Sequence, residues 1–175
     1  MNPGFNMRLN VALTFNVKPD CPDMVGPDRK SETFHEALSP LDKKSNDSSQ
    51  KINNAADTYA EWDTWDTINA VKNALECFHD VTLIEADLNA VQKLKEFRPD
   101  IVFNIAEGFN GVSREAQIPA ILDMFQIPYS GSDPLTLSIC LDKARTKEIL
   151  SYYKIPNSRF IVLNSLNQPL HHSQR

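Results

Sequence analysis

The most informative segment of the chain is residues 100–155, which read DIVFNIAEGFNGVSREAQIPAILDMFQIPYSGSDPLTLSICLDKARTKEILSYYKI. An apolar run at 101–105 predicts a buried strand, and a polar loop with two glycines follows it at 106–111. After an amphipathic helix, a second short strand is predicted at 127–129, and the turn Ser-Gly-Ser follows at 130–132. In an open α/β sheet, ligands bind outside the carboxyl ends of the strands. Because polar residues follow both strands, we expect the functional site here.

Strands and helices alternate along most of the chain. The strands are predicted at 9–17, 81–86, 101–105, 127–129 and 159–163. The helices are predicted at 64–78, 89–97 and 143–153, with two more that begin at Ser113 or nearer Ile118, and after Asp133. Alternation of this kind is typical of parallel strands joined by right-handed crossovers. The sequence therefore predicts an α/β fold with an open parallel sheet and helices on both faces.

Composition limits the class of protein. The 175 residues are 41% hydrophobic and 23% charged, which indicates an ordinary globular chain of one domain, or one domain and a piece of a second. The net charge is −5 without a basic cluster, which argues against nucleic acid or an anionic membrane as the main partner. No apolar run approaches the roughly 20 residues of a membrane helix. The start of the chain does not resemble a signal peptide.

Cysteine usage and low-complexity stretches complete this outline. Cys21, Cys77 and Cys140 are odd in number and far apart, so we expect reduced thiols in a cytoplasmic protein, with Cys140 in the core. Residues 19–56 contain four prolines and the polar run KKSNDSSQKINN, which predicts a long disordered loop. Such a loop is either functional or a solvated insertion. The polar residues 164–175 predict a disordered tail.

The loop at 106–111 carries the first group of candidate site residues. Its glycines precede a helix, so its backbone N–H groups could face an anion, although the spacing matches neither GxGxxG nor a P-loop. A simple connection is the alternative interpretation. Glu107 could orient an amine, and Arg114 could bind a carboxylate in bidentate fashion. Alternatively, Arg114 and Glu115 form a solvated pair at the start of a helix.

A second candidate is Lys143, which follows Asp142 at a junction between helices. A point cation at such a place could bind phosphate. Trp62 and Trp65 are interpreted as packing residues, because no basic groove surrounds them. The four histidines have no partner at metal-ligand or catalytic spacing, so we assign them no role.

Four motifs stand in order along the chain: IPYSGS at 127–132, LDK at 141–143, TK at 146–147 and IP at 155–156. Together they resemble the N-terminal, pre-ATP-grasp part of the D-alanine–D-alanine ligase group of ATP-grasp enzymes. The turn IPYSGS at 127–132 is similar to the family's Ile-Pro-Tyr-Thr-Gly-Ser turn. LDK at 141–143 with TK at 146–147 is similar to its Met-Asp-Lys and Thr-Lys, and IP at 155–156 to its Gly-Ile-Pro entry into a strand. Gln117 corresponds to a family glutamine. The resemblance covers residues 81–163, and the order of the motifs is more specific than any one of them.

This resemblance implies a Rossmann-like pre-ATP-grasp domain at 1–135, followed at 136–163 by a linker helix and the first strand of an ATP-grasp domain. It also implies ATP-dependent joining of a carboxylate and an amine through an acyl phosphate, with Mg²⁺ bridging the phosphates. Lys143 would contact an ATP phosphate. A small amino-acid or carboxylate substrate would meet Glu107, Gly108, Arg114, Ser130, Gly131 and Ser132. Family members are commonly homodimers, and no metal ligand is expected in this chain.

The chain also differs from the family pattern. Glu107 replaces the histidine of a His-Gly loop, GVSR at 111–114 replaces Gly-Glu-Asp-Gly, and NVKP at 16–19 replaces a glycine-rich loop whose glutamate holds an amine. These differences favour another amino acid or small carboxylate at least as much as D-alanine. The family's second lysine, lid loop, catalytic arginine and magnesium ligands have no counterpart, so we expect an N-terminal fragment that is inactive alone. The alternatives are a free-standing small-ligand-binding module, a subunit of a split enzyme, or a fragment that binds nothing.

Overall fold

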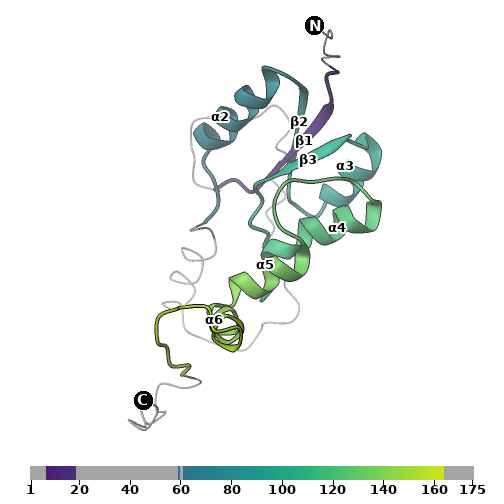
Figure 1. Ribbon diagram of the computed structural model, residues 1–175. Coiled ribbons are helices and arrows are strands. Elements are labelled where there is room, and N and C mark those ends of the chain that lie inside the picture. The colour runs from purple at the N-terminus through teal and green to yellow at the C-terminus, as the bar shows by residue number, and fades with distance from the viewer. Residues whose placement is uncertain (1–6, 19–58, 60, 164–175) are drawn as a thin grey trace, which may run out of the picture.

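The computed structural model describes residues 7–18, 59 and 61–163, and its centre is a parallel three-stranded sheet (Figure 1). The strands are β1 (Asn10–Phe15), β2 (Asp80–Glu85) and β3 (Ile101–Asn104), in the spatial order β2-β1-β3. All pairings are parallel, which confirms the predicted sheet. The loop predicted at 19–56 and the tail predicted at 164–175 lie outside the described residues.

β1 is the central strand, and its environment explains its sequence. Val11 pairs with Val81 of β2 and with Ile101 of β3. From Val11 to Phe15, every residue is buried. A strand with neighbours on both edges and helices on both faces has no solvent-exposed face, so its buried residues are mainly apolar rather than alternating, with Thr14 as the exception. The expectation of strand 9–17 is therefore met by β1 and a short bridge at Val17.

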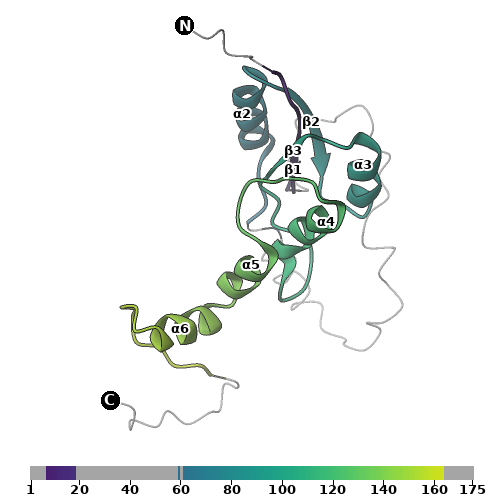
Figure 2. The ribbon, with the colours of Figure 1, turned by 45° about the vertical axis from the view of Figure 1, so that its right-hand side comes forward.

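Helices cover both faces of the sheet, as predicted (Figures 1 and 2). On one face lies α2 (Trp65–Glu76), and on the other lie α3 (Ala90–Phe97) and α4 (Gln117–Phe125). The core on the α2 face contains Leu13, Phe15, Val17 and Ile68. The core on the opposite face contains Ala12, Ile84, Ala86, Ala90, Leu94, Val102, Ala106, Ile118 and Leu122. Within the described ranges, no helix combines the length and the apolar character needed to cross a membrane.

The helix boundaries follow local chemistry. Thr64 is the N-cap of α2, where its Oγ1 accepts from the N–H of Thr67 at 3.4 Å. α3 ends at Arg98, which has a φ of 48° and precedes Pro99. The helix expected after Ser113 begins with a short 3-10 helix, η1 (Arg114–Ala116), and continues as α4. Pro119 is thereby in the first turn of α4, where its missing N–H is tolerated.

The fourth strand predicted at 127–129 is reduced to one bridge, between Val102 and Tyr129. The N–H of Val102 donates to the Pro128 carbonyl at 2.8 Å, and the N–H of Ser130 donates to the Val102 carbonyl at 2.9 Å. Pro128 has no N–H to donate, so the ladder cannot continue through it. The predicted segment therefore lies along β3 without forming a full strand.

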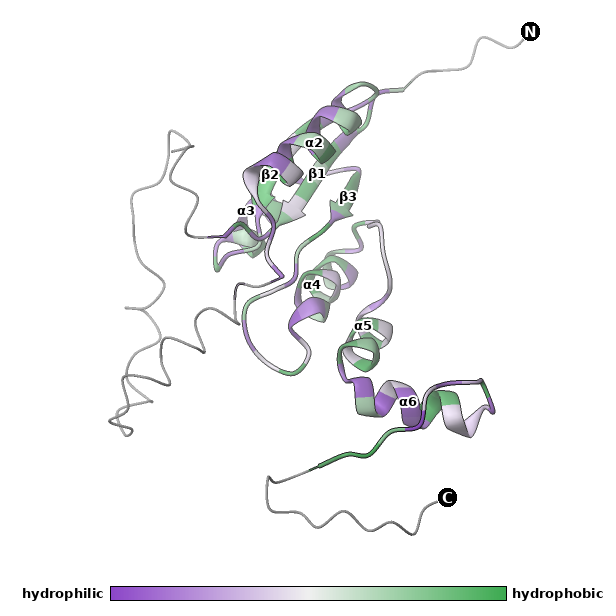
Figure 3. Ribbon diagram, turned by 90° about the vertical axis from the view of Figure 1, so that its left-hand side faces the viewer, coloured by the Kyte–Doolittle hydropathy of each residue, from purple (hydrophilic) through white to green (hydrophobic). Residues whose placement is uncertain are grey.

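Beyond the sheet, α5 (Pro134–Leu141) and α6 (Lys143–Tyr152) extend away from it (Figures 1 and 2). Neither helix contains a fully buried residue, so the prediction that Cys140 belongs to the core is wrong. The strand predicted at 159–163 is also wrong, because residues 156–163 have no regular structure in the described chain. Apolar residues alone do not make a strand, since its backbone groups need a neighbouring strand. Figure 3 shows this apolar stretch in green after α6.

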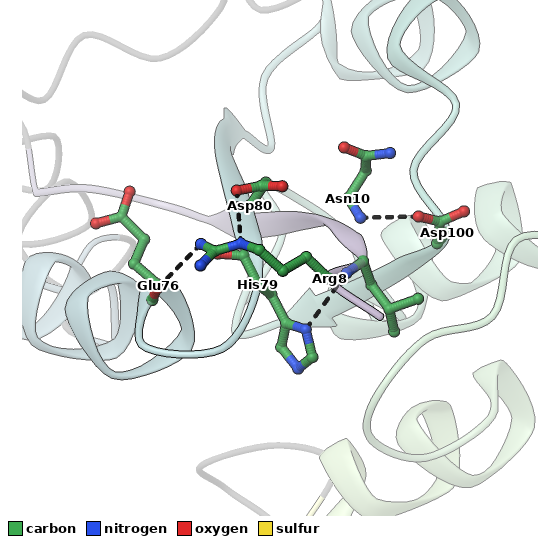
Figure 4. A network of polar contacts seen from close by, with 7 residues as sticks. Arg8, Asn10, Glu76, His79, Asp80 and Asp100 are labelled. Carbon is green, nitrogen blue, oxygen red and sulfur yellow. Dashed lines mark hydrogen bonds and ion pairs between the residues drawn. The ribbon is translucent and has the colours of Figure 1, made fainter. Parts of the chain in front are cut away.

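At the amino end of the sheet, a polar network joins the strand starts (Figure 4). The Arg8 guanidinium donates from Nε to Asp80 Oδ1 at 3.0 Å and from Nη2 to the His79 carbonyl at 2.7 Å and the Glu76 carbonyl at 3.3 Å. The N–H of Asn10 donates to Asp100 Oδ2 at 2.8 Å. These bonds satisfy carbonyls at the end of α2. The candidate site lies at the opposite, carboxyl end of the sheet.

Candidate functional site

Asn16, directly after β1, joins the carboxyl ends of all three strands. Its side chain is buried, and its Nδ2 donates to the carbonyl of Ala86, just after β2, at 3.1 Å. Its Oδ1 accepts from the N–H of Gly108, beyond β3, at 2.9 Å. Its backbone carbonyl accepts from the N–H of Asp63 at 3.0 Å. One side chain therefore holds the loops that follow the strands in a fixed arrangement.

The loop at 106–111 closes over Trp62 and Gln117. The indole N–H of Trp62 donates to the Gly108 carbonyl at 3.2 Å, and its ring meets Phe109 edge-on with centroids 5.0 Å apart. Gln117 Oε1 accepts from the N–H of Phe109 at 3.3 Å, and Nε2 donates to the Asn110 carbonyl at 2.8 Å. These contacts confirm that Trp62 is a packing residue, and they show that the loop is held on two sides.

Three carboxylates gather beside this loop. Oxygens of Glu61, Glu107 and Glu115 lie within 4.8 Å of one another. Arg114 forms an ion pair with Glu61, and its Nη2 lies 3.9 Å from Glu115 Oε1. One guanidinium thus faces three carboxylates, so the group carries a net negative charge. A cluster of this kind favours a bound cation or ammonium group over a second anion.

The environment of Glu107 reflects this crowding. Burial raises the pKa of the Glu107 carboxyl, and the charges of Glu115 and Glu61 raise it further, whereas Arg114 lowers it. Burial also raises the pKa of Asp63, with Lys18 acting in the opposite direction. Carboxyls with raised pKa values at a strand end are typical of functional sites, because the folded chain holds them in an unfavourable place.

The structure changes the interpretation of Arg114. The sequence suggested either a clamp for a substrate carboxylate or a solvated pair with Glu115. In the structure, the Arg114 guanidinium is half-buried and engaged with Glu61. A substrate carboxylate would have to displace that side chain. Arg114 therefore acts first as the partially neutralising charge among the three glutamates.

The Ser-Gly-Ser turn lies next to the same strand end. The N–H of Asn104, the last residue of β3, donates to Ser130 Oγ at 3.0 Å. Gly131 has a φ of 99°, in the region that favours glycine, and nothing lies within 4 Å of where a Cβ would stand. Gly131 and Ser132 are exposed. Ser130 thus has a structural partner, while the tip of the turn faces solvent.

Lys143 lies apart from these residues. It is the exposed first residue of α6, and Asp142 Oδ1 accepts from the N–H groups of Ala144 at 2.9 Å and Arg145 at 3.1 Å. Because the Asp142 cap occupies these donors, a phosphate there would meet the lysine side chain rather than the helix N-terminus. In the described part of the chain, no hydrogen bond or ion pair joins Lys143 to the Glu107 group.

Sequence reasoning missed Asn16, Glu61 and Asp63 as site residues. Asn16 had a local signal, since it is a polar residue at the end of an apolar strand. Glu61 and Asp63 had none, because they precede a helix far from Glu107 in the sequence. Only packing brings them to the loop after β3.

Comparison with known proteins found relatives that match part of the chain. No known family model matches the chain. The D-alanine–D-alanine ligases of Moorella thermoacetica and Pelotomaculum thermopropionicum are each 35% identical to it, over 83 and 98 residues. The resemblance to the D-alanine–D-alanine ligases is confirmed. An uncharacterized protein, y4sG of Sinorhizobium fredii, is 33% identical over 96 residues.

These matches to D-alanine–D-alanine ligases have a limited extent. They cover 47% and 55% of this chain but only 26% and 30% of the two ligases, and the S. fredii match covers 50% of the chain and 29% of that protein. The chain thus matches under a third of the length of these relatives. A crystal structure of the Bacillus anthracis D-alanine–D-alanine ligase with ATP covers 94% of this chain at 20% identity, with a TM-score of 0.46. This structural similarity is too low to support a family or a function for the chain.

Proposed function

We propose that this chain forms the N-terminal, substrate-side unit of an ATP-dependent carboxylate–amine ligase. The observation that carries the proposal is the group of three glutamates around Arg114 at the carboxyl edge of a parallel sheet, in a chain homologous to D-alanine–D-alanine ligases. In this reaction type, a carboxylate takes a phosphoryl group from ATP and the resulting acyl phosphate is attacked by an amine, with release of phosphate.

The chain's own residues contribute to substrate binding in this proposal. Glu107, supported by Glu61 and Glu115, receives the ammonium group of an amino-acid substrate. Gly108 lets the loop approach closely, and the exposed Ser132 and Gly131 border the same strand end. Burial beside carboxylates strengthens the attraction for a cationic group, because the surrounding dielectric is lower than that of water. Arg114 limits the total negative charge and keeps the glutamates together.

ATP supplies the phosphoryl group when bound, and Mg²⁺ offsets its negative charge. Lys143 fits a phosphate contact, since it is exposed, positively charged and free of ion pairs within the described residues. We assign no magnesium ligand in this unit. We therefore propose that the 175-residue chain does not turn over ATP on its own.

A second candidate function is a small-ligand-binding module that needs no ATP. The specific observation in its favour is that Glu61, Glu107, Arg114 and Glu115 all come from the α/β unit itself. Such a module would hold an amino acid at the glutamates whether or not Lys143 is present. The two functions differ in the effect of Lys143 on ATP.

Calorimetric titration of the chain with D-alanine, then with Mg·ATP, separates these functions. For the ligase unit, we expect Glu107→Gln to weaken D-alanine binding about tenfold or more by removing a charged partner, while Lys143→Ala leaves it unchanged. Lys143→Ala, but not the matched control Arg145→Ala on the same helix, should weaken ATP binding. Amino-acid binding with ATP affinity insensitive to Lys143 supports the module instead.

Two further outcomes refute the proposal. ATP hydrolysis by the purified chain above that of Lys143→Ala would contradict its inactivity. Titration with other small amino acids and carboxylates tests which of them binds, because the differences from the family pattern make D-alanine only one candidate substrate. If no such ligand binds, the proposed substrate site is wrong.

A further inference from the structure

Two buried side chains hold the peptide groups on both sides of Gly108. Asn16 Oδ1 accepts from the Gly108 N–H at 2.9 Å, and the Trp62 indole N–H donates to the Gly108 carbonyl at 3.2 Å. Asn16 is 1% exposed and Trp62 is 6% exposed. Neither residue belongs to the loop that it holds. Losing a partner in such a place leaves a buried donor or acceptor unsatisfied, so the arrangement is strongly specified.

Packing alone does not explain an asparagine at this position. β1 is apolar from Val11 to Leu13 and again at Phe15, and Asn16, just after the strand, is as deeply buried as these residues. A leucine at position 16 would leave the Gly108 N–H and the Ala86 carbonyl without their present partners. The amide of Asn16 is the side chain that donates to one loop and accepts from the other.

The position of Glu107 depends on this arrangement. Its carbonyl and the Gly108 N–H belong to one planar peptide group, so the bond to Asn16 also limits the orientation of Glu107. Its carboxylate faces Glu61 and Glu115, and like charges at this separation repel. In a loose loop, the carboxylates would move apart. A rigid backbone is therefore needed to keep them close.

We infer that Asn16 and Trp62 are positioning residues that hold the Gly108 backbone and thereby aim the Glu107 carboxylate at the substrate's ammonium group. The ammonium group as ligand rests on the proposed function, whereas the clamp on Gly108 does not. Asn16 and Trp62 act through Glu107 and do not touch the ligand in this inference. It predicts that replacing Asn16 changes the titration of Glu107 more than replacing a residue that forms a similar number of hydrogen bonds elsewhere in the chain.

The test compares Asn16→Leu and Trp62→Phe with the matched control Arg8→Met in the 175-residue chain. Arg8 also forms three side-chain hydrogen bonds, but at the opposite end of the same strand (Figure 4). NMR measures the exchange rate of the Gly108 amide hydrogen and the titration midpoint of the Glu107 carboxyl. Calorimetry measures D-alanine affinity.

We expect Asn16→Leu to speed Gly108 exchange about tenfold or more beyond Arg8→Met, since the amide loses its acceptor. The Glu107 midpoint should fall toward that of an ordinary glutamate, because the loop opens to water and moves away from Glu61, Asp63 and Glu115, which outweighs separation from Arg114. D-alanine affinity should fall about tenfold. Trp62→Phe, which keeps the aromatic ring and loses the N–H, should cause smaller changes in the same directions.

Equal Gly108 exchange and an equal Glu107 midpoint in Asn16→Leu and Arg8→Met would overturn the inference. If Asn16→Leu does not fold, the same comparison with Trp62→Phe decides. If the unmodified chain binds no amino acid, the proposed function fails. The exchange and titration results still decide the clamp on Gly108, because they need no ligand.

Discussion

Gly108 packs directly against the backbone of Arg114: a Cβ added at Gly108 would lie 2.1 Å from the Arg114 carbonyl oxygen. The φ of Gly108 is 73°, in the left-handed region that side chains rarely adopt. Because Gly108 has no side chain, the loop after β3 can pack closely against the start of η1. This close approach brings Glu107 and Arg114 into one group.

Gly108→Ala should be strongly destabilising. The substitution adds backbone strain and forces the loop away from Arg114, so we expect a loss of about 3 kcal/mol or more in the free energy of unfolding. Gly111→Ala is the matched control, because Gly111 also has a positive φ, of 100°, but nothing lies within 4 Å of its Cβ position. It should cost about 1 to 2 kcal/mol from strain alone. Urea denaturation measures both, and equal losses would contradict the close packing.

Glu107→Gln should stabilise the chain at neutral pH. Folding raises the pKa of Glu107 above the ordinary value of 4.5, so its contribution to stability is full below 4.5 and is lost as the pH rises through the folded-state pKa. At pH 7 the ionised carboxylate costs stability that glutamine avoids. After allowance for solvent screening, we expect a gain of about 0.5 to 1 kcal/mol.

The pH dependence is the control for this prediction. At about pH 3.5 the Glu107 carboxyl is mainly protonated and uncharged, as a glutamine is at any pH. The gain from Glu107→Gln should therefore largely disappear. Thermal unfolding at the two pH values measures the difference. A gain that is the same at both pH values would show that charge is not its cause.

Arg8→Met should destabilise the chain more than loss of its ion pair alone. Arg8 and Asp80 are 51% and 64% exposed, so Asp80→Asn should cost less than about 0.5 kcal/mol. Arg8 also donates to the carbonyls of Glu76 and His79, and we expect Arg8→Met to cost about 1 to 2 kcal/mol. Urea denaturation of both variants tests this difference. Equal effects would mean that the carbonyl contacts contribute nothing.

The α5–α6 region should bind apolar dyes. Leu135, Tyr152 and Ile161 are 69%, 80% and 69% exposed, and exposed apolar side chains in one region favour association (Figure 3). We expect the dye ANS to bind the folded chain, and Leu135→Ser combined with Ile161→Ser to reduce its fluorescence about twofold or more. Leu88→Ser is the matched control, because Leu88 is 65% exposed between β2 and α3.

Sedimentation velocity of the same variants examines the predicted homodimer. If α5 and α6 mediate self-association, the double variant should sediment as a smaller species than the unmodified chain at high concentration. Leu88→Ser should not change the sedimentation coefficient. Identical sedimentation of all three chains would exclude this surface from any dimer contact.

Much of the fold was predictable because its signals are local. Asp133 begins α5 as expected, and Thr64 begins α2 at the start of the predicted helix 64–78, since a short polar side chain accepts from the free N–H groups of the following turn. The apolar run of β3 and its place in a parallel sheet also followed from the pattern. The prediction at 159–163 failed because the same apolar pattern needs a partner strand that the described residues do not provide.

The site was predictable only in part. Glu107, Gly108 and Arg114 belong to one continuous segment, so their neighbourhood could be expected. The role expected for Arg114 changed, because Glu61 occupies its guanidinium. Glu61 comes from a distant segment, and no sequence period links the two.

The sequence by itself determined the order of strands and helices, the helix caps and the placement of polar residues after the strands. These features depend on side-chain periodicity and on hydrogen bonds between near neighbours. Only the tertiary structure decided that Asn16 holds Gly108 and that Glu61 joins Glu107. Contacts of this kind arise when separate segments bury their apolar faces on one sheet, and their geometry depends on how all of those segments pack together.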